Sequence, residues 1–150
     1  MSSIYPLLVR KAAVSLTAAV AFPGTSLFTV SGGKVMIYSF FARVMTTVGA
    51  GAVTIQPITL RSGGVVTQEF AYSLDSGTLA TAPVGAYLSF GDPTAVPTAS
   101  FGSGWVNGLV TGSEPGTISV VITVGDGGTG TLDFFVLWAP LEQTAKLVAA

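Results

Sequence analysis

One segment of the chain has the form of a cofactor-binding loop. Residues 125–130 read Gly-Asp-Gly-Gly-Thr-Gly and match the G-x-G-x-x-G fingerprint of dinucleotide-binding domains. In those domains the third glycine opens a helix whose N-terminus holds the pyrophosphate. Residues 131–136 are instead Thr, Leu, Asp, Phe, Phe and Val, the composition of a strand. We therefore interpret the segment as a hairpin loop and predict no cofactor. A calcium ion on Asp126 is the alternative, and a single nearby carboxylate argues against it.

The carboxylates are the remaining candidates for catalysis. The acidic residues are Glu69, Asp75, Asp92, Glu114, Asp126, Asp133 and Glu142. A glycosidase needs two of them roughly 5–10 Å apart, and turn signals explain Asp75 and Asp92 more simply. The chain has no His and no Cys, which excludes Ser-His-Asp triads, thiolate zinc sites and cysteine nucleophiles. We predict that the protein is not an enzyme; a hydrolase that uses two converging carboxylates is the alternative.

Three aromatic residues could bind sugar. Trp105, Trp138 and Tyr87 would form a stacking platform if they met on one surface. Packing of at least one tryptophan in the core is the simpler interpretation. A carbohydrate-binding β-module therefore stays open as an alternative function.

The composition points to contact with other proteins. Hydrophobic residues make up 49% of the chain and charged residues 9%, against about 25% charged in an ordinary domain. Six basic and seven acidic residues give a net charge of −1, so no positive field exists to bind nucleic acid. With so little charge to cover its surface, we expect part of the exterior to be buried by another protein.

The N-terminal segment has the outline of a secretory leader. Arg10 and Lys11 precede an uncharged run, residues 12–22, that contains Ala-Val-Ala at 19–21. The basic pair follows an already apolar stretch, so a first strand is the better interpretation. The sequence has no apolar run of the ~18–20 residues that a membrane-spanning helix needs, and we predict no membrane partner.

Short strands punctuated by glycine and proline account for most of the chain. We expect strands in residues 14–17, 27–30, 34–48, 52–61, 65–74, 86–90, 105–110, 117–124 and 131–138, a turn at Pro23-Gly24, and one or two helical turns in 141–150. Pro57 should lie in an edge strand or at a bulge. The predicted fold is all-β: an antiparallel β-sandwich or β-barrel-like domain with long loops and an extended N-terminal arm. Residues 1–22 form the arm and first strand, and residues 23–150 form a single all-β domain.

The longest predicted strand, residues 34–48, is apolar on both faces. Strict alternation assigns Met36, Tyr38, Phe40, Ala42 and Val44 to one face and Val35, Ile37, Phe41 and Met45 to the other. Such a strand is central in its sheet or is buried by a neighbouring subunit.

Two segments resemble small structural proteins of tailed bacteriophages. Residues 27–35 (Leu-Phe-Thr-Val-Ser-Gly-Gly-Lys-Val), with Arg-Val-Met-Thr-Thr at 43–47, resemble their "FTV-x-GG-x-V … V-x-TT" opening. Residues 130–145, which begin Gly-Thr-Leu and contain Trp-Ala-Pro-Leu at 138–141, are similar to their final strand and "Y/W-x-PL" exit. The resemblance implies a decoration or cement protein on the capsid exterior that forms a homo-oligomer, a trimer, and bridges subunits of the major capsid protein. A tail or fibre-tip module is the alternative within the virion.

The predicted interface combines the N-terminal arm with three aromatic side chains. Its residues are Ile4, Tyr5, Leu7, Leu8, Val9, Phe40, Phe41 and Trp138. The arm is too apolar to be left in solvent and too short to build its own core. The three aromatic residues are expected to contact another chain or to lie in the core.

Overall fold

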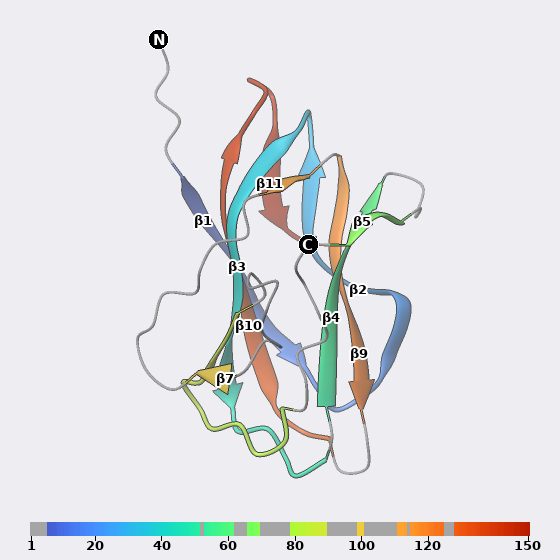
Figure 1. The fold of residues 1–150 in the computed structure, drawn as a ribbon, viewed down its shortest axis with the longest axis vertical. Helices are drawn as coiled ribbons and strands as arrows, with labels where there is room; N and C mark the ends of the chain where they lie inside the picture. Colours follow the sequence, from blue (N-terminus) through green and yellow to red (C-terminus); the bar gives the residue numbers. More distant parts are fainter. Residues whose placement is uncertain are drawn as a thin grey trace.

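The protein is a sandwich of two antiparallel β-sheets. The computed structural model describes residues 6–51, 53–61, 66–69, 79–89, 99–100, 111–113, 115–124 and 128–150. The two sheets lie face to face and do not close into a barrel (Figure 1). The all-β prediction is confirmed, and of the two architectures expected from the sequence the structure has the sandwich.

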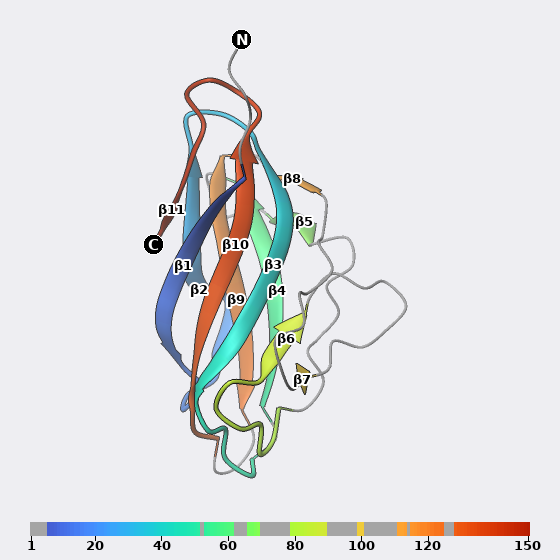
Figure 2. The same cartoon turned by 90° about the vertical axis from the view of Figure 1, so that its left-hand side faces the viewer.

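The first sheet presents its broad face in Figure 2. Its strand order is β1 (Leu7–Ser15), β10 (Thr131–Pro140), β3 (Val35–Thr46), β6 (Tyr87–Ser89) and β7 (Ala99–Ser100), and β8 (Thr111–Ser113) also pairs with β3. The central pair, β10 and β3, runs in register from Thr131–Thr46 to Pro140–Val35 with two irregularities.

The second sheet lies behind the first in that view. Its order is β11 (Lys146–Ala149), β2 (Val20–Ser31), β9 (Gly116–Val124), β4 (Val53–Arg61) and β5 (Val66–Glu69). Consecutive strands lie in different sheets at seven places: β1–β2, β2–β3, β3–β4, β5–β6, β8–β9, β9–β10 and β10–β11. Each of these strands therefore packs against a sheet that contains its neighbour in sequence.

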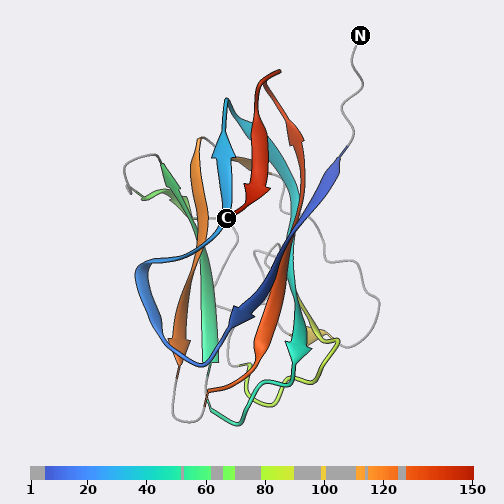
Figure 3. The ribbon, with the colours of Figure 1, turned by 180° about the vertical axis from the view of Figure 1, so that it is seen from behind.

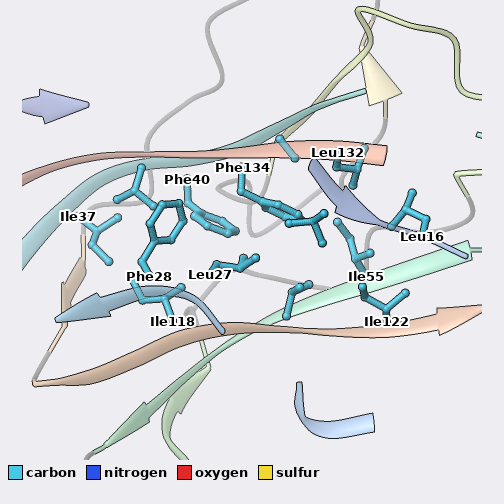
Figure 4. Packing of buried hydrophobic residues seen from close by; sticks show 14 of the residues in the cluster. Leu16, Leu27, Phe28, Ile37, Phe40, Ile55, Ile118, Ile122, Leu132 and Phe134 are labelled. Atoms are coloured by element: carbon cyan, nitrogen blue, oxygen red, sulfur yellow. The ribbon is translucent and has the colours of Figure 1, made fainter. Parts of the chain in front are cut away.

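Aromatic side chains from both sheets fill the space between them. Phe28 on β2 meets Phe40 on β3 edge to face, with ring centroids 6.5 Å apart, and Phe40 stacks on Phe134 of β10 at 5.9 Å (Figure 4). Leu16 and Ile55 are also fully buried there. Burial of these side chains is the main source of stability, because each removes a large apolar area from water.

A bulge changes which face of β3 points inward. The register between β10 and β3 shifts between Leu137 and Trp138, where Leu137 pairs with Ser39 and Trp138 with Ile37. Ile37 and Phe40, three residues apart, are therefore both buried in the core. The expectation that Phe40 and Ile37 lie on opposite faces is wrong, because the extra residue of a bulge reverses the alternation.

Pro23 and Gly24 also lie at an irregularity inside a strand. We expected a turn before a strand at residues 27–30, but β2 runs from Val20 to Ser31. Its register against β9 shifts between Val20 and Thr25, where the strand bends widely (Figure 3). Gly24 has φ +83°, a conformation that glycine adopts without strain.

The C-terminal segment forms a strand, and the predicted helical turns are wrong. β11 pairs with β2 from Lys146–Ser31 to Ala149–Phe28. Its Leu147 is buried in the core, and the preceding Ala145 is buried as well. Sheet pairing and burial override the helix propensity of these residues.

The strand predicted at residues 14–17 belongs to β1, which begins at Leu7 and ends at Ser15, so part of the predicted N-terminal arm is a strand of the first sheet. The other predicted strands are found where the structure describes them. Residues 52–61 correspond to β4, where Pro57 pairs with Val120 of β9, while β5 pairs only with Ile58–Leu60. β4 lies between β9 and β5, and its register against β9 is unbroken at Pro57, so the described pairs of this strand show neither the predicted edge strand nor a bulge at the proline. Residues 70–74 and the predicted strand at 105–110 lie outside the described residues. None of the described residues forms a helix long and apolar enough to cross a membrane.

Candidate interaction surface on the first sheet

Asp133 is the buried one of the two acidic residues whose exposure the structure describes, the other being Glu142. Asp133 lies on β10, 3% exposed, and its Oδ2 is 2.7 Å from Arg10 Nη2 on β1. Its Oδ1 accepts a hydrogen bond of 2.8 Å from the backbone N–H of Ala13. Ala13 has φ +56° and lies in the bulge where the register of β1 shifts between Lys11 and Val14. Asp133 thus attaches β1 to the sheet and satisfies a backbone donor that the bulge releases from the ladder.

The second carboxylate whose contacts the structure describes lies far from the first. Glu142 follows the end of β10, where its Oε2 accepts a hydrogen bond of 3.1 Å from the N–H of Lys34. Seven residues of extended strand between Asp133 and Pro140 span roughly 23 Å. These two acids therefore do not converge on one cleft.

The remaining acids add no metal-binding cluster to the described part of the chain. Asp75, Asp92, Glu114 and Asp126 lie outside the described residues, and Glu69 is described only as part of β5. Among the residues that the structure describes, no group of three or more His, Cys, Asp or Glu could hold a metal ion.

The proposed sugar platform does not form from Trp138 and Tyr87. Trp138 is 7% exposed and belongs to the core between the sheets. Tyr87 lies near Phe41 on the outer face of the first sheet, with ring centroids 6.1 Å apart, and the Arg43 guanidinium lies 5.7 Å from its ring centroid. The two aromatic side chains are on opposite faces of that sheet. Trp105 lies outside the described residues.

The aromatic residues of the predicted interface divide between the two faces. Phe40 and Trp138 have the core role, one of the two expected for them. Phe41 is half-buried on the outer face, where it stacks on Phe135 with centroids 5.0 Å apart. The sequence pattern did not single out Phe135, although its position opposite Phe41 in the ladder brings the rings together.

The N-terminal half of β1 is the most exposed apolar segment of the predicted interface. Leu7 is 49% exposed and Leu8 57%, while Val9 packs against the core. Ile4 and Tyr5 lie outside the described residues. β1 ends the strand order of the first sheet and, within the described part of the chain, pairs with β10 alone (Figure 3). The N-terminal half of β1 therefore combines two exposed apolar side chains with a strand edge that has no described partner.

Other exposed apolar side chains are scattered over the molecule. Met45, Val84, Leu141 and Val148 are 39%, 59%, 49% and 52% exposed. They belong to different elements, and single apolar residues of this kind are normal on a protein surface. Leu7 and Leu8 are distinguished because they are adjacent exposed apolar residues on one edge strand, whereas Val148 is a single such residue on β11.

Comparison with known proteins adds no relative: no family model, curated protein or solved structure matches the chain.

Proposed function

We propose that the protein is a non-catalytic structural protein of a virion, which self-associates and stabilises a capsid by bridging its subunits from the outside. The observation that carries the proposal is the exposed apolar edge strand, with Leu7 and Leu8 at 49% and 57% exposure. A protein in which charged residues make up only 9% of the chain has few side chains that keep such an edge in solvent.

Two parts of the proposal, the location on a capsid and the trimeric state, rest on the resemblance of the β2–β3 and β10–β11 segments to phage structural proteins. β2 and β3 carry the motif Phe28-Thr29-Val30 and the turn after it, and β10 ends in Trp138-Ala139-Pro140. In this structure β2, β3 and β10 are inner strands of the two sheets, and β11 is an edge strand. The resemblance therefore concerns the framework of the sandwich, and the surface of β1 supplies a contact between copies.

Bridging requires only modest contacts when several act together. A trimer that touches several capsid subunits at once converts each later contact into an intramolecular one, so that weak contacts give tight attachment. No reaction and no bound group are needed for this role, only apolar surface held on a rigid sandwich.

Cosedimentation with expanded shells of a tailed-phage major capsid protein tests the proposal. We expect the protein to sediment with expanded shells and to raise the temperature at which they disassemble. Val84→Lys, which changes an exposed apolar residue away from β1, should bind as the parent does. Absence of shell binding, or binding to a glycan array in its place, would overturn the proposal.

A further inference from the structure

The two halves of β1 differ in how easily their outer edge could pair with a further strand. From Leu7 to Lys11 the strand pairs residue by residue with Trp138 to Phe134 of β10, without irregularity. Beyond Lys11 the register shifts before Val14. A bulge twists a strand edge and hinders further pairing, so the second half is protected and the first half is regular.

The C-terminal end of the chain lies beside β1 where this second half begins. Lys11 Nζ donates a hydrogen bond to the carbonyl oxygen of Ala150, which directly follows β11. The N–H of Ala150 in turn donates to the carbonyl of Leu27 on β2, at 2.9 Å. These contacts leave residues 7–10 as the open part of the edge.

The two cations of β1 already have partners within the chain. Arg10 is paired with Asp133, and Lys11 is bound to the Ala150 carbonyl. Acidic side chains on an added strand would therefore compete with partners that these cations already have. What remains for it to contact is apolar: Leu7, Leu8 and the side of Val9 that the core leaves open.

We infer that the occupant of this edge is the same segment of a second copy, paired antiparallel across a two-fold axis centred on Leu8. In that register Leu8 faces Leu8 of the other copy, and Leu7 faces its Val9. Both Arg10 side chains then lie toward the ends of the paired segment, where their charges are apart. The contact joins two first sheets into one continuous sheet, as in strand addition at an exposed edge.

The contact is small. Four strand residues span only about 13 Å, and a stable interface buries about 800 Å² on each partner. The pairing is therefore weak in dilute solution and gains strength when copies are held close together. It rests on the proposed self-association but is separate from the capsid contact, because an isologous pairing joins copies two by two and would link one trimer to the next.

Single cysteine variants test the pairing directly, because the natural chain has no cysteine. Facing residues of antiparallel strands have Cα atoms about 4.5–5.5 Å apart, within the range of a disulfide. At high protein concentration under mild oxidation, Leu8→Cys should form disulfide dimers about tenfold or more faster than the controls, because a preformed contact raises the effective thiol concentration.

The controls place a thiol of similar exposure elsewhere. Val148→Cys lies on the edge strand β11, and Val84→Cys lies in a turn; the parent residues are 52% and 59% exposed. Val9→Cys lies one position from the proposed axis, where the two thiols would be too far apart to bond. Equal rates for all four variants, or no dimer with Leu8→Cys, would overturn the inference.

A charge variant separates this inference from the proposed function. Leu8→Lys brings two cations together at the axis and should abolish the disulfide between a Leu7→Cys copy and a Val9→Cys copy, which face each other in the proposed register, while circular dichroism remains that of the parent. If Leu8→Cys gives no dimer and the parent still binds shells, the pairing is wrong and the structural role stands. If Leu8→Cys forms dimers but the parent does not bind shells, the pairing stands and the proposed role on a capsid is wrong.

Discussion

Asp133 shows how a single charged residue can serve an apolar sheet. It is 3% exposed, whereas its partner Arg10 is 55% exposed. The carboxylate accepts both the Arg10 guanidinium and the Ala13 N–H, so it connects β10 to β1 on each side of the β1 bulge. Its role in this structure is attachment of the edge strand.

The two partners of this ion pair should contribute unequally to stability. Asp133→Ala leaves the Ala13 donor without its acceptor and should lower the free energy of unfolding by about 2–3 kcal/mol. Arg10→Ala removes a largely solvated charge and should cost less than about 1 kcal/mol. Urea unfolding measures both, and equal losses would contradict the role given to Asp133.

At the scale of elements, a bulge allows β2 to bend across the second sheet. Gly24 combines φ +83° with a tight position: a Cβ there would lie 2.5 Å from the Val120 carbonyl oxygen. Gly85 has a similar φ of +90°, and nothing lies within 4 Å of where its Cβ would be. A side chain at Gly85 would therefore meet backbone strain alone, whereas one at Gly24 would meet both backbone strain and a close contact.

Alanine at these glycines should show that difference. Gly85→Ala should cost roughly 1 kcal/mol from its left-handed conformation alone. Gly24→Ala adds a clash with the backbone of β9 and should cost about 2–4 kcal/mol. The midpoints of chemical unfolding compare the two, and similar losses would show that β2 can shift away from β9 at little cost.

Two adjacent phenylalanines on β10 point to opposite faces of the first sheet, so alanine at each position compares the stability that the two faces contribute. Phe134 is fully buried and stacks on Phe40, while Phe135 is half-buried on the outer face against Phe41. Phe134→Ala should cost about 3–5 kcal/mol, and Phe135→Ala about 1–2 kcal/mol. Thermal unfolding of the two variants measures the difference, and a larger loss for Phe135→Ala would mean that the outer face is covered in solution.

At the scale of the whole molecule, self-association should appear as concentration-dependent stability. Binding between folded copies favours the folded state by mass action, so the unfolding midpoint should rise with protein concentration. Calorimetry over a hundredfold dilution measures this, with Leu8→Lys as the variant in which the contribution of β1 is lost. A midpoint that does not change with concentration for the parent would show that the folded protein is monomeric over that range.

The sequence alone determined the class of the fold. Glycine and proline mark turns and bulges locally, and the runs between them, rich in Val, Ile, Thr, Phe and Tyr, predict short antiparallel strands. The lack of His and Cys limits the available chemistry however the chain folds. These features are local or compositional, so each residue carries its own part of the signal.

Only the tertiary structure decided the strand order and the partners that follow from it. Asp133 meets Arg10, and Phe40 points inward with Ile37, because β10 lies between β1 and β3 and the register shifts at Trp138. The helical propensity of the last residues gave way to pairing with β2. Pairing joins residues more than a hundred positions apart, and a one-residue shift exchanges the two faces of a strand, so local patterns do not contain this information.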